Sequence, residues 1–531
     1  MVAASELPIE TVREGTTAED MANAIFGDGV QVQGASYTGD IDSAGIYSDG
    51  DSVAPGVTPS DTGVILSTGN AESFTNSSGD ANQDTNTSAN TTGQNNNAQF
   101  NAAAGAATRD AAYLDVDFIP DGNVMTMQFV FSSEEYPEFA TSQYQDFVGV
   151  WINGAQVDVA VGDGDTDPGN INSASNINLF VDNTNSDFNT EMDGFTVTMT
   201  LTIPVNDGQL NSIRIGIADV ADANYDSNLL IAGDSLQTSV IANADDVNVY
   251  PNGETTLDVL ANDIGPGTLT VTHINGQPVS YDPVTETGTT ITLATGQQVT
   301  IGPGGVLTIV GDGDEEDFNF TYTITDGTNT DTGFINATSV PCFVAGTMIE
   351  TAEGPRAVES LRAGDMVLTH DDGLQPLRWI GTRTVRAEAQ FAPIHIRAGT
   401  FGAHADVMVS PLHRVLVRDS VAELLFGEAE VLIAAKDLVN DRSVRRVPGG
   451  QVTYVHLMFD AHQVVFTEGL ASESFLPGPQ TTSVLEDAVV AEICAIFPEL
   501  DPDTGAGYGE AARRTLRHYE ADLLQKAKAV A

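Results

Sequence analysis

Short runs in which apolar and polar residues alternate recur along this chain and limit the folds that it can adopt. Examples are VMTMQFVFS (124–132), FVGVWING (147–154) and IRIGIADV (213–220), and Gly, Asn and Asp separate such runs. A period of two sends successive side chains to opposite faces of a strand, and the separating residues favour turns. Because 531 residues also exceed the usual size of one core, the sequence predicts a mainly β, multidomain protein.

Charge divides the chain near residue 341. Residues 1–340 contain three arginines, no lysine and 49 acidic residues, whereas residues 341–531 contain 17 basic and 26 acidic residues. The first part therefore carries most of the formal net charge of −55 (3 − 49 = −46). Such a charge repels nucleic acid and anionic lipid headgroups and attracts cations. We expect no nucleic-acid partner, and we expect a domain boundary close to residue 341.

The first 240 residues combine strand signals with one helix signal and one polar stretch. Thr17 is a suitable N-cap for the segment AEDMANAIFG, and the low-complexity stretch 73–105 predicts a long mobile loop. Five stretches carry a resemblance to a known family: AEDMANAIFGDGVQVQGASYTGD (18–40), DTGVILSTGNA (61–71), FVFSSEEYPEF (129–139), DGFTVTMTLTIPVN (193–206) and ADANYDSNLLIAGDSLQ (221–237). This part resembles the bacterial choice-of-anchor L domain. The resemblance implies an extracellular β-rich module at 1–240, to which the family assigns no chemistry.

Residues 241–338 contain about seven further strand signals, from NADDVNVYPNGETTLDVLANDIG to FNFTYTITDGTNTDTGFINAT. The number and the spacing of these strands predict an Ig-like β-sandwich. The segment is similar to the cadherin-like domains of bacterial adhesins. That similarity implies that it acts as a spacer.

Cys342 is the second residue after the boundary, where its sulfur can attack the carbonyl group of Pro341. A thiolate is a strong nucleophile even as a minor species at neutral pH, and cleavage also requires a histidine to protonate the departing nitrogen. Of the eight histidines, only His273 precedes the boundary. Ser410 and His413 lie three residues apart in SPLHRVLV, about 70 residues after the cysteine. These residues predict a chain that cuts or rearranges itself at Pro341–Cys342.

The same segment resembles the bacterial branch of the Hint domain, which hedgehog proteins and inteins share. The resemblance rests on CFVAGTMIET, VSPLHRV and YVHLMFDAHQVVFTEGLASESFLPG, and it implies an all-β Hint fold at 339–480. It implies that Cys342 is the nucleophile and that His413 polarises and protonates the scissile peptide. Ser410 stands where the family has threonine. His462 is the second histidine, which the resemblance associates with resolution of the thioester.

The only asparagine after residue 340 is Asn440, in mid-domain, so we expect splicing not to finish. Hydrolysis of the thioester, or its capture by an amine or an alcohol, remains. The partners we expect are the chain itself as substrate, water or a surface nucleophile as acyl acceptor, and a cell-surface or matrix partner. The alternative is a non-enzymatic surface adhesion or matrix protein whose Hint fold is inactive or serves only export.

The C-terminal segment 481–531 has apolar residues at helical spacing, which predicts α-helices that cap the preceding domain. Asp163, Asp165 and Asp167 alternate as in calcium loops, but an acidic solvated loop is the preferred interpretation. The proposed chemistry requires no cofactor and no metal. We find no cleavable N-terminal signal and no membrane-spanning run, and we expect an extracellular or cell-surface protein that is exported by another route.

Overall fold

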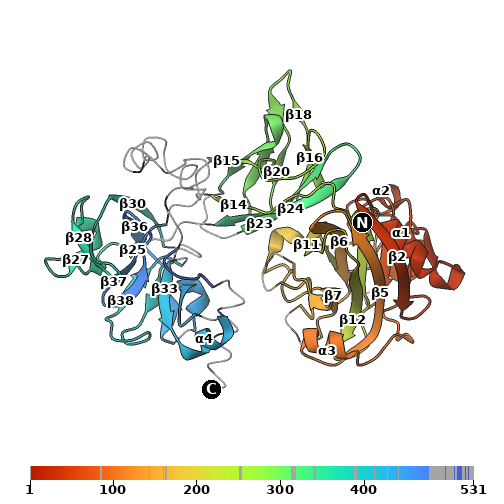
Figure 1. The fold of residues 1–531 in the computed structure, drawn as a ribbon, viewed down its shortest axis with the longest axis horizontal. Helices are drawn as coiled ribbons and strands as arrows, with labels where there is room; N and C mark the ends of the chain where they lie inside the picture. The colour runs from red at the N-terminus through yellow and green to blue at the C-terminus, as the bar shows by residue number, and fades with distance from the viewer. Residues whose placement is uncertain are drawn as a thin grey trace. The chain divides into compact units, whose positions relative to one another are not determined.

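The computed structural model describes residues 2–524 apart from 84–85, 141, 143, 160, 162–163, 250–253, 313–317, 339–342, 388–391, 412, 427, 441, 477–496, 498–507, 509–510, 517–520 and 522–523. The protein is mainly β, as the alternating runs predicted. Two compact units make up the chain (Figure 1). The first comprises Met1–Asp245, Leu257–Thr308 and Phe318–Asn336, and the second comprises Asp246–Thr256, Ile309–Asp317 and Ala337–Ala531.

The N-terminal part of the first unit consists of two antiparallel sheets and three short helices. One sheet has the order β1-β3-β4-β13-β6-β10-β9 with β11 beside β6, and the other has the order β2-β5-β12-β7-β8. The elements are α1 (Ala18–Ile25), α2 (Gly50–Val53), α3 (Ala98–Ala104), β1 (Ile9–Thr11), β2 (Val30–Thr38), β3 (Ala44–Tyr47), β4 (Gly63–Ser67), β5 (Thr108–Pro120), β6 (Val124–Ser133), β7 (Phe147–Ile152), β8 (Ala155–Gln156), β9 (Phe180–Asp182), β10 (Gly194–Thr196), β11 (Met199–Pro204), β12 (Asn211–Val220) and β13 (Ser227–Ala232).

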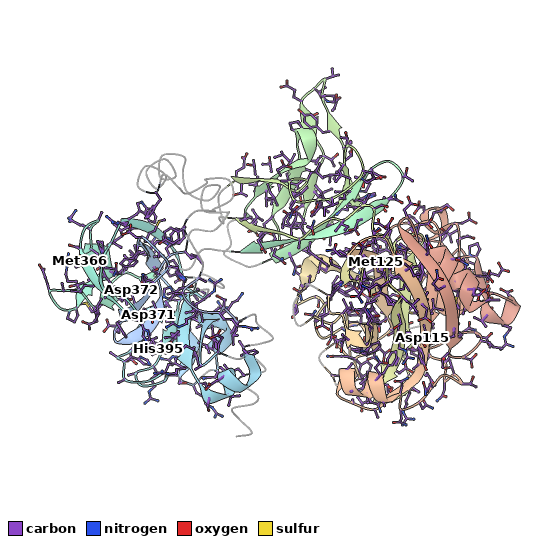
Figure 2. All side chains as sticks on the ribbon, viewed as in Figure 1. Asp115, Met125, Met366, Asp371, Asp372 and His395 are labelled. Carbon is purple, nitrogen blue, oxygen red and sulfur yellow. The ribbon has the colours of Figure 1, made fainter. Side chains whose placement is uncertain are left out.

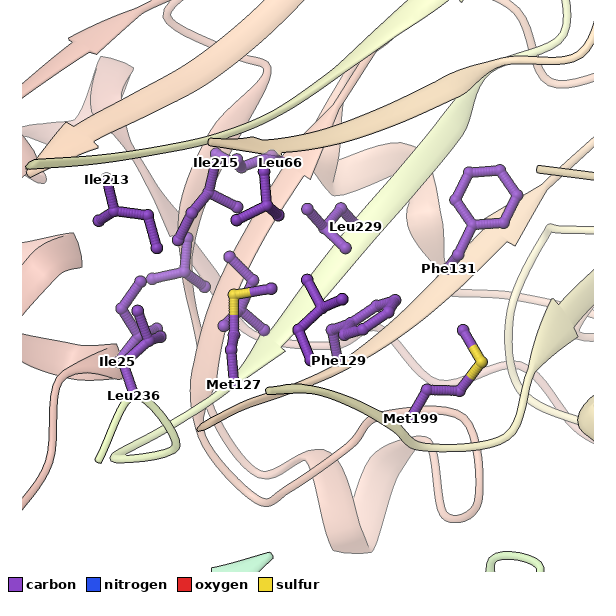
Figure 3. Close-up of a cluster of buried hydrophobic side chains, with 14 of the residues drawn as sticks. Ile25, Leu66, Met127, Phe129, Phe131, Met199, Ile213, Ile215, Leu229 and Leu236 are labelled. Atoms are coloured by element: carbon purple, nitrogen blue, oxygen red, sulfur yellow. The ribbon is translucent and has the colours of Figure 1, made fainter. Parts of the chain in front are cut away.

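Alternation along β12 explains how these sheets form a core. Ile213, Ile215 and Ile217 project from one face of the strand into a large apolar cluster, to which the facing sheet contributes Met127 and Leu229 (Figure 3). Successive side chains of a strand point to opposite faces, so the intervening residues project from the other side of the sheet. The period of two thus decides which sheet face is buried.

Two of the three short helices have clear N-caps. Thr17 caps α1 as predicted, because its hydroxyl accepts the Asp20 N–H. The stretch that was expected to be a structureless loop instead contains α3, which Asn97 caps through the N–H groups of Gln99 and Phe100. Phe100 is fully buried against Trp151, with the ring centroids 5.0 Å apart. One large aromatic side chain therefore anchors a segment whose composition otherwise indicates disorder.

Residues 241–338 contain short strands, as predicted, and the first unit includes most of them. Their bounds are β14 (Asp245–Asn248), β15 (Glu254–Asp258), β16 (Thr270–Ile274), β17 (Gln277–Pro278), β18 (Tyr281–Asp282), β19 (Thr287–Gly288), β20 (Thr290–Thr292), β21 (Gln298–Ile301), β22 (Val306–Val310), β23 (Phe318–Thr325) and β24 (Thr330–Thr338). Gln128 of β6 donates its Nε2–H to the Thr330 carbonyl oxygen at 2.8 Å, and Phe334 packs in the same apolar cluster as β12. Strand β24 therefore contacts the N-terminal sheets. The finer domain boundaries at 240 and 338 stay predictions.

The second unit contains two further sheets and one described α-helix. One sheet has the order β30-β36-β25-β32-β31-β35. The other has the order β27-β26-β37-β38-β33-β34, in which β28 pairs with β37 and β29 pairs with β28. The elements are α4 (Ser420–Phe426), β25 (Phe343–Val344), β26 (Met348–Ile349), β27 (Arg356–Ala357), β28 (Met366–Thr369), β29 (Gly373–Pro376), β30 (Trp379–Arg386), β31 (Ile394–Ile396), β32 (Val407–Val409), β33 (Arg414–Arg418), β34 (Glu430–Ala434), β35 (Val444–Arg446), β36 (Gln451–Met458), β37 (Val464–Thr467) and β38 (Leu470–Glu473). The 3-10 helices in the described residues are η1 (Val12–Glu14), η2 (Ala71–Phe74), η3 (Ile177–Leu179), η4 (Pro303–Gly305), η5 (Val358–Ser360) and η7 (Ala435–Leu438).

The C-terminal segment departs from the prediction where the structure describes it. Residues 511–516 fall within a predicted helix, but they are not helical. The Leu432 N–H donates to the Arg514 carbonyl oxygen at 2.8 Å, and the Leu516 N–H donates to the Leu432 carbonyl oxygen at 2.9 Å. Leu432 lies in β34, at the end of its sheet, and an unpaired edge offers backbone groups that a passing segment can satisfy. Most of the predicted helices at 481–531 lie outside the described residues.

No helix in the described part of the chain is long and apolar enough to cross a membrane.

Candidate functional site

The strand that follows the predicted cleavage point lies in the middle of a sheet. Phe343 is the first described residue after the boundary and begins β25, where it pairs with Val409 of β32 and Val455 of β36. Its side chain is buried in the apolar core. Pro341 and Cys342 themselves lie outside the described residues. The backbone of β25, directly after the predicted cleavage point, is thus paired with a strand on each side.

His413 lies directly against this strand. Its ring centroid is 4.4 Å from that of Phe343, and its side chain is 1% exposed. Neither ring nitrogen has a hydrogen-bond partner among the described residues. The pKa of His413 is lowered to about 4: burial is the main cause, the Glu473 charge acts in the opposite direction, and the charges of His456, Arg414 and His462 add to the lowering. The imidazole is therefore neutral at physiological pH, with both nitrogens available for proton transfer.

Ser410 and His413 form one tight turn between β32 and β33. The His413 N–H donates to the Ser410 carbonyl oxygen at 3.1 Å, and the Ala435 N–H donates to the His413 carbonyl oxygen at 3.0 Å. Ser410 is 2% exposed. The turn fixes the backbone of both residues and presents His413 to the core side of the sheets.

His462 occupies a buried position in which both ring nitrogens have partners. Nδ1 accepts the Ala512 N–H at 3.0 Å, which places the ring proton on Nε2. Nε2 lies 3.1 Å from the Ser474 carbonyl oxygen and 3.5 Å from Glu473 Oε2. The extended C-terminal segment therefore sets the tautomer of His462.

Glu473 joins these histidines and was not singled out from the sequence. It is fully buried at the end of β38, and its Oε1 accepts the Arg414 N–H at 2.9 Å. Burial acts to raise the pKa of Glu473, but the Arg414 charge and the His462 hydrogen bond outweigh it and lower the pKa. A carboxylate thus lies charged between His413 and His462. The only sequence signal was an acidic residue inside the otherwise apolar and small-residue strand LASE.

Comparisons with known proteins assign this region to a family. Residues 341–479 match the family described as Hint domain, and residues 10–237 match the choice-of-anchor L domain. The second unit contains a Hint domain. The first unit contains a choice-of-anchor L domain, and both agree with the resemblances seen in the sequence. Neither match extends to residues 238–340, so the cadherin-like interpretation stays a prediction.

Solved structures similar to this chain include two inteins. The crystal structure of gp41-1 intein is 9% identical, with a TM-score of 0.17, and the match covers 25% of this chain and 97% of that chain. The crystal structure of MchDnaB-1 intein is 15% identical, with a TM-score of 0.17, and covers 25% and 98%. A comparison with curated protein sequences finds no match.

Other polar residues of the Hint domain have structural partners. His456 of β36 packs between the rings of Trp379 and Phe475, with centroids 6.5 and 5.6 Å away. His395, labelled in Figure 2, lies on β31 with its Nε2 3.7 Å from Asp406 Oδ1.

Asn440 stabilises a turn before β35. Its Oδ1 accepts the N–H groups of Arg442, Ser443 and Val444. This asparagine therefore acts as a turn residue in the described fold.

The candidate calcium loop of the first unit is described only in part. Asp163 lies outside the described residues, and Asp167 Oδ1 accepts the N–H groups of Gly169 and Asn170. No group of three or more His, Cys, Asp or Glu side chains in the described residues is already arranged to hold a metal ion. Whether Asp163, Asp165 and Asp167 bind calcium stays untested.

Proposed function

We propose that the Hint domain cleaves its own chain between Pro341 and Cys342. His413 is the observation that supports this most directly. Its buried ring packs on Phe343, which follows Cys342 directly in the chain, and neither ring nitrogen has a partner in the described part of the chain. Consecutive Cα atoms are about 3.8 Å apart, so the contact with Phe343 supports a role for this imidazole at the scissile peptide.

In the proposed first step the Cys342 sulfur attacks the Pro341 carbonyl carbon and forms a C–S bond. The C–N bond of the peptide breaks, and its electron pair stays on the Cys342 nitrogen. Neutral His413 accepts the thiol proton and delivers it to that nitrogen, so that protons and charges balance. The low pKa of His413 suits this relay, because a weakly basic imidazole returns the proton readily. The product is a thioester with a free α-amine on Cys342.

In the proposed second step an external nucleophile opens the thioester. Water releases residues 1–341 with a free carboxylate, and an amine or an alcohol leaves that part with a new C-terminal link. His462 is the proposed second histidine, held by Ala512 and Glu473. Ser410 is placed to steady the His413 turn.

At the level of the whole protein, we propose an exported bacterial surface protein. The choice-of-anchor L domain and the strongly acidic first 340 residues support this proposal. Processing would then release or covalently anchor the N-terminal part. No cofactor is required by these steps.

Intact-mass measurement of freshly purified protein tests the proposal. Wild type, Cys342→Ala and the matched control Cys494→Ala are compared with and without hydroxylamine or added thiol. We expect fragments 1–341 and 342–531 from wild type and from the control, and intact chain from Cys342→Ala. An intact wild type that strong nucleophiles leave unchanged would refute self-cleavage. It would favour the non-enzymatic adhesion interpretation.

A further inference from the structure

Five carboxyl groups are buried together at one end of the two N-terminal sheets. Asp110 and Asp219 lie on β5 and β12, Asp146 directly precedes β7, Glu135 follows β6 and Asp226 precedes β13. Each is at most 2% exposed. We call these five residues the buried carboxyl cluster. Both sheets contribute, since β6 and β13 belong to one and β5, β7 and β12 to the other.

Basic side chains of this part of the chain do not neutralise the cluster, although the Arg109 charge opposes the burial that raises the pKa of Asp110. Residues 1–340 contain only three basic residues, Arg13, Arg109 and Arg214. Arg13 pairs with Asp42, and Arg214 pairs with Asp115 at 2.7 Å (Figure 2).

Arg109 is exposed, and its Nε–H points to the Ala221 carbonyl oxygen at 3.5 Å. Across the described residues, no ion pair joins a basic group to the cluster. Burying several carboxylates without a compensating charge is strongly unfavourable, so these groups must either be protonated or be paired with a bound cation.

Several carboxylate oxygens of the cluster lack a donor. In the described part of the chain, Glu135 Oε2, Asp219 Oδ1 and Asp226 Oδ2 are buried without a hydrogen-bond partner, and so is Asp110 Oδ1. The pKa of Glu135 is raised to about 8, mainly by burial and also by the charges of Asp222 and Asp219. Buried oxygens without donors point to a ligand that supplies positive charge.

Two other oxygens of the cluster hold the loop of residues 86–95 in place. Asp226 Oδ1 accepts the Ala89 N–H at 2.8 Å, and Asp110 Oδ2 accepts the Thr91 N–H at 3.2 Å. A Cβ atom on Gly69 would lie 1.8 Å from Asp226 Oδ2, so only glycine leaves room for this oxygen. The backbone is thus shaped around the carboxylates.

Neutral oxygens lie beside the cluster. The Ser227 hydroxyl donates to Asp146 Oδ2 at 2.6 Å and lies 2.8 Å from the Ser133 hydroxyl. Calcium takes six to eight oxygen ligands in flexible geometry, whereas nitrogen or sulfur ligands would suit transition metals. The described side chains form no ready-made set of three acidic or histidine ligands, so binding would require the carboxylates to move toward the ion. An ion would draw the carboxylates together.

We propose that the buried carboxyl cluster binds one hard divalent cation of the calcium type, which neutralises the carboxylates and fixes the 86–95 loop over the end of the sandwich. Glu135 and Asp219 are the central ligands. This site lies in the choice-of-anchor L domain and is independent of the proposed cleavage.

Calcium titration of the full-length Cys342→Ala protein tests the proposal at pH 7.5. After chelator treatment, we expect calorimetry to show one Ca²⁺ bound per chain. At a hundredfold excess over the Kd, the Tm of the first unit should rise by roughly 5–10 °C. Glu135→Gln and Asp219→Asn should each bind at least about tenfold more weakly. Asp117→Asn, an exposed carboxylate on the same β5, is the matched control and should bind normally.

Two outcomes would overturn the proposal. One is the absence of heat and of a Tm shift with Ca²⁺ up to about 10 mM, above the weakest extracellular calcium sites. The carboxyl groups would then be protonated and need no ion. The other is equal binding by Glu135→Gln, Asp219→Asn and the parent protein. The titration of the parent protein does not depend on either variant. The proposal can therefore be refuted even if Glu135→Gln and Asp219→Asn fail to fold.

Discussion

Burial of neutral His413 should make the Hint domain less stable in mild acid. The pKa of His413 is lowered from 6.5 to about 4, and burial is the main cause. Between these values the unfolded chain binds a proton at this residue that the folded domain does not bind. The free energy of unfolding therefore falls as pH falls from about 6.5 to 4.

The magnitude follows from the two pKa values. The full difference of about 2.5 pH units corresponds to about 3.4 kcal/mol. At pH 5 about 2 kcal/mol of this has been lost relative to pH 7.5. The lowered pKa of Glu473 keeps that carboxylate charged at pH 5, so it does not obscure the effect.

Urea unfolding at pH 7.5 and pH 5 measures this loss. The chain has two tryptophans, Trp151 in the first unit and Trp379 in the second. Trp151→Phe leaves Trp379 as a reporter of the Hint domain, and Cys342→Ala keeps the chain intact. His413→Leu should lose about 2 kcal/mol of pH dependence, because leucine does not titrate.

His404→Gln is the control, because it replaces a histidine at a partly exposed position of the same domain. The reasoning is refuted if His413→Leu retains the pH dependence of its parent. It is equally refuted if the parent is as stable at pH 5 as at pH 7.5.

Three further changes test other contacts. Glu473→Gln removes the charge that faces Arg414 and should destabilise the Hint domain by about 3–5 kcal/mol in urea unfolding; a loss below about 1 kcal/mol would contradict a buried ion pair. Ala512→Pro removes the N–H that donates to His462 and should slow thioester opening while hydroxylamine cleavage stays fast, as followed by intact mass over time. Equal slowing of both would contradict a role confined to the second step. Thr17→Ala should cost about 1 kcal/mol in unfolding followed at Trp151, and an unchanged midpoint would contradict the cap.

The sequence predicted the folds better than the contacts. Alternation predicted the sheets because the period of two is local, and the Hint and choice-of-anchor L resemblances were confirmed. The helix α3 was missed because its anchor is tertiary: Phe100 packs on Trp151, far along the chain. Residues 511–516 have helical spacing, but pairing with Leu432 outweighs that preference.

The site residues show the same contrast between local sequence signals and tertiary contacts. His413 could be proposed from its spacing to Cys342, and its place beside Phe343 is consistent with that proposal. Glu473 could not be proposed, because its role depends on which strands meet and not on its neighbours in the sequence. The catalytic assignments of Cys342, Ser410, His413 and His462 stay predictions.

The Ala512 contact bears on how this protein is handled at the bench. The Hint match ends at residue 479, and a fragment trimmed there would look complete. It would nevertheless lack the N–H that fixes the His462 ring, together with the backbone partners of Leu432. Such a shortened version could retain its sheets while the His462 ring keeps only its Ser474 and Glu473 contacts and loses the bond that sets its tautomer. Purification tags are therefore safer at the N-terminus. If trimming abolishes self-cleavage, the missing Ala512 contact should be considered as the cause before a defect in the catalytic residues.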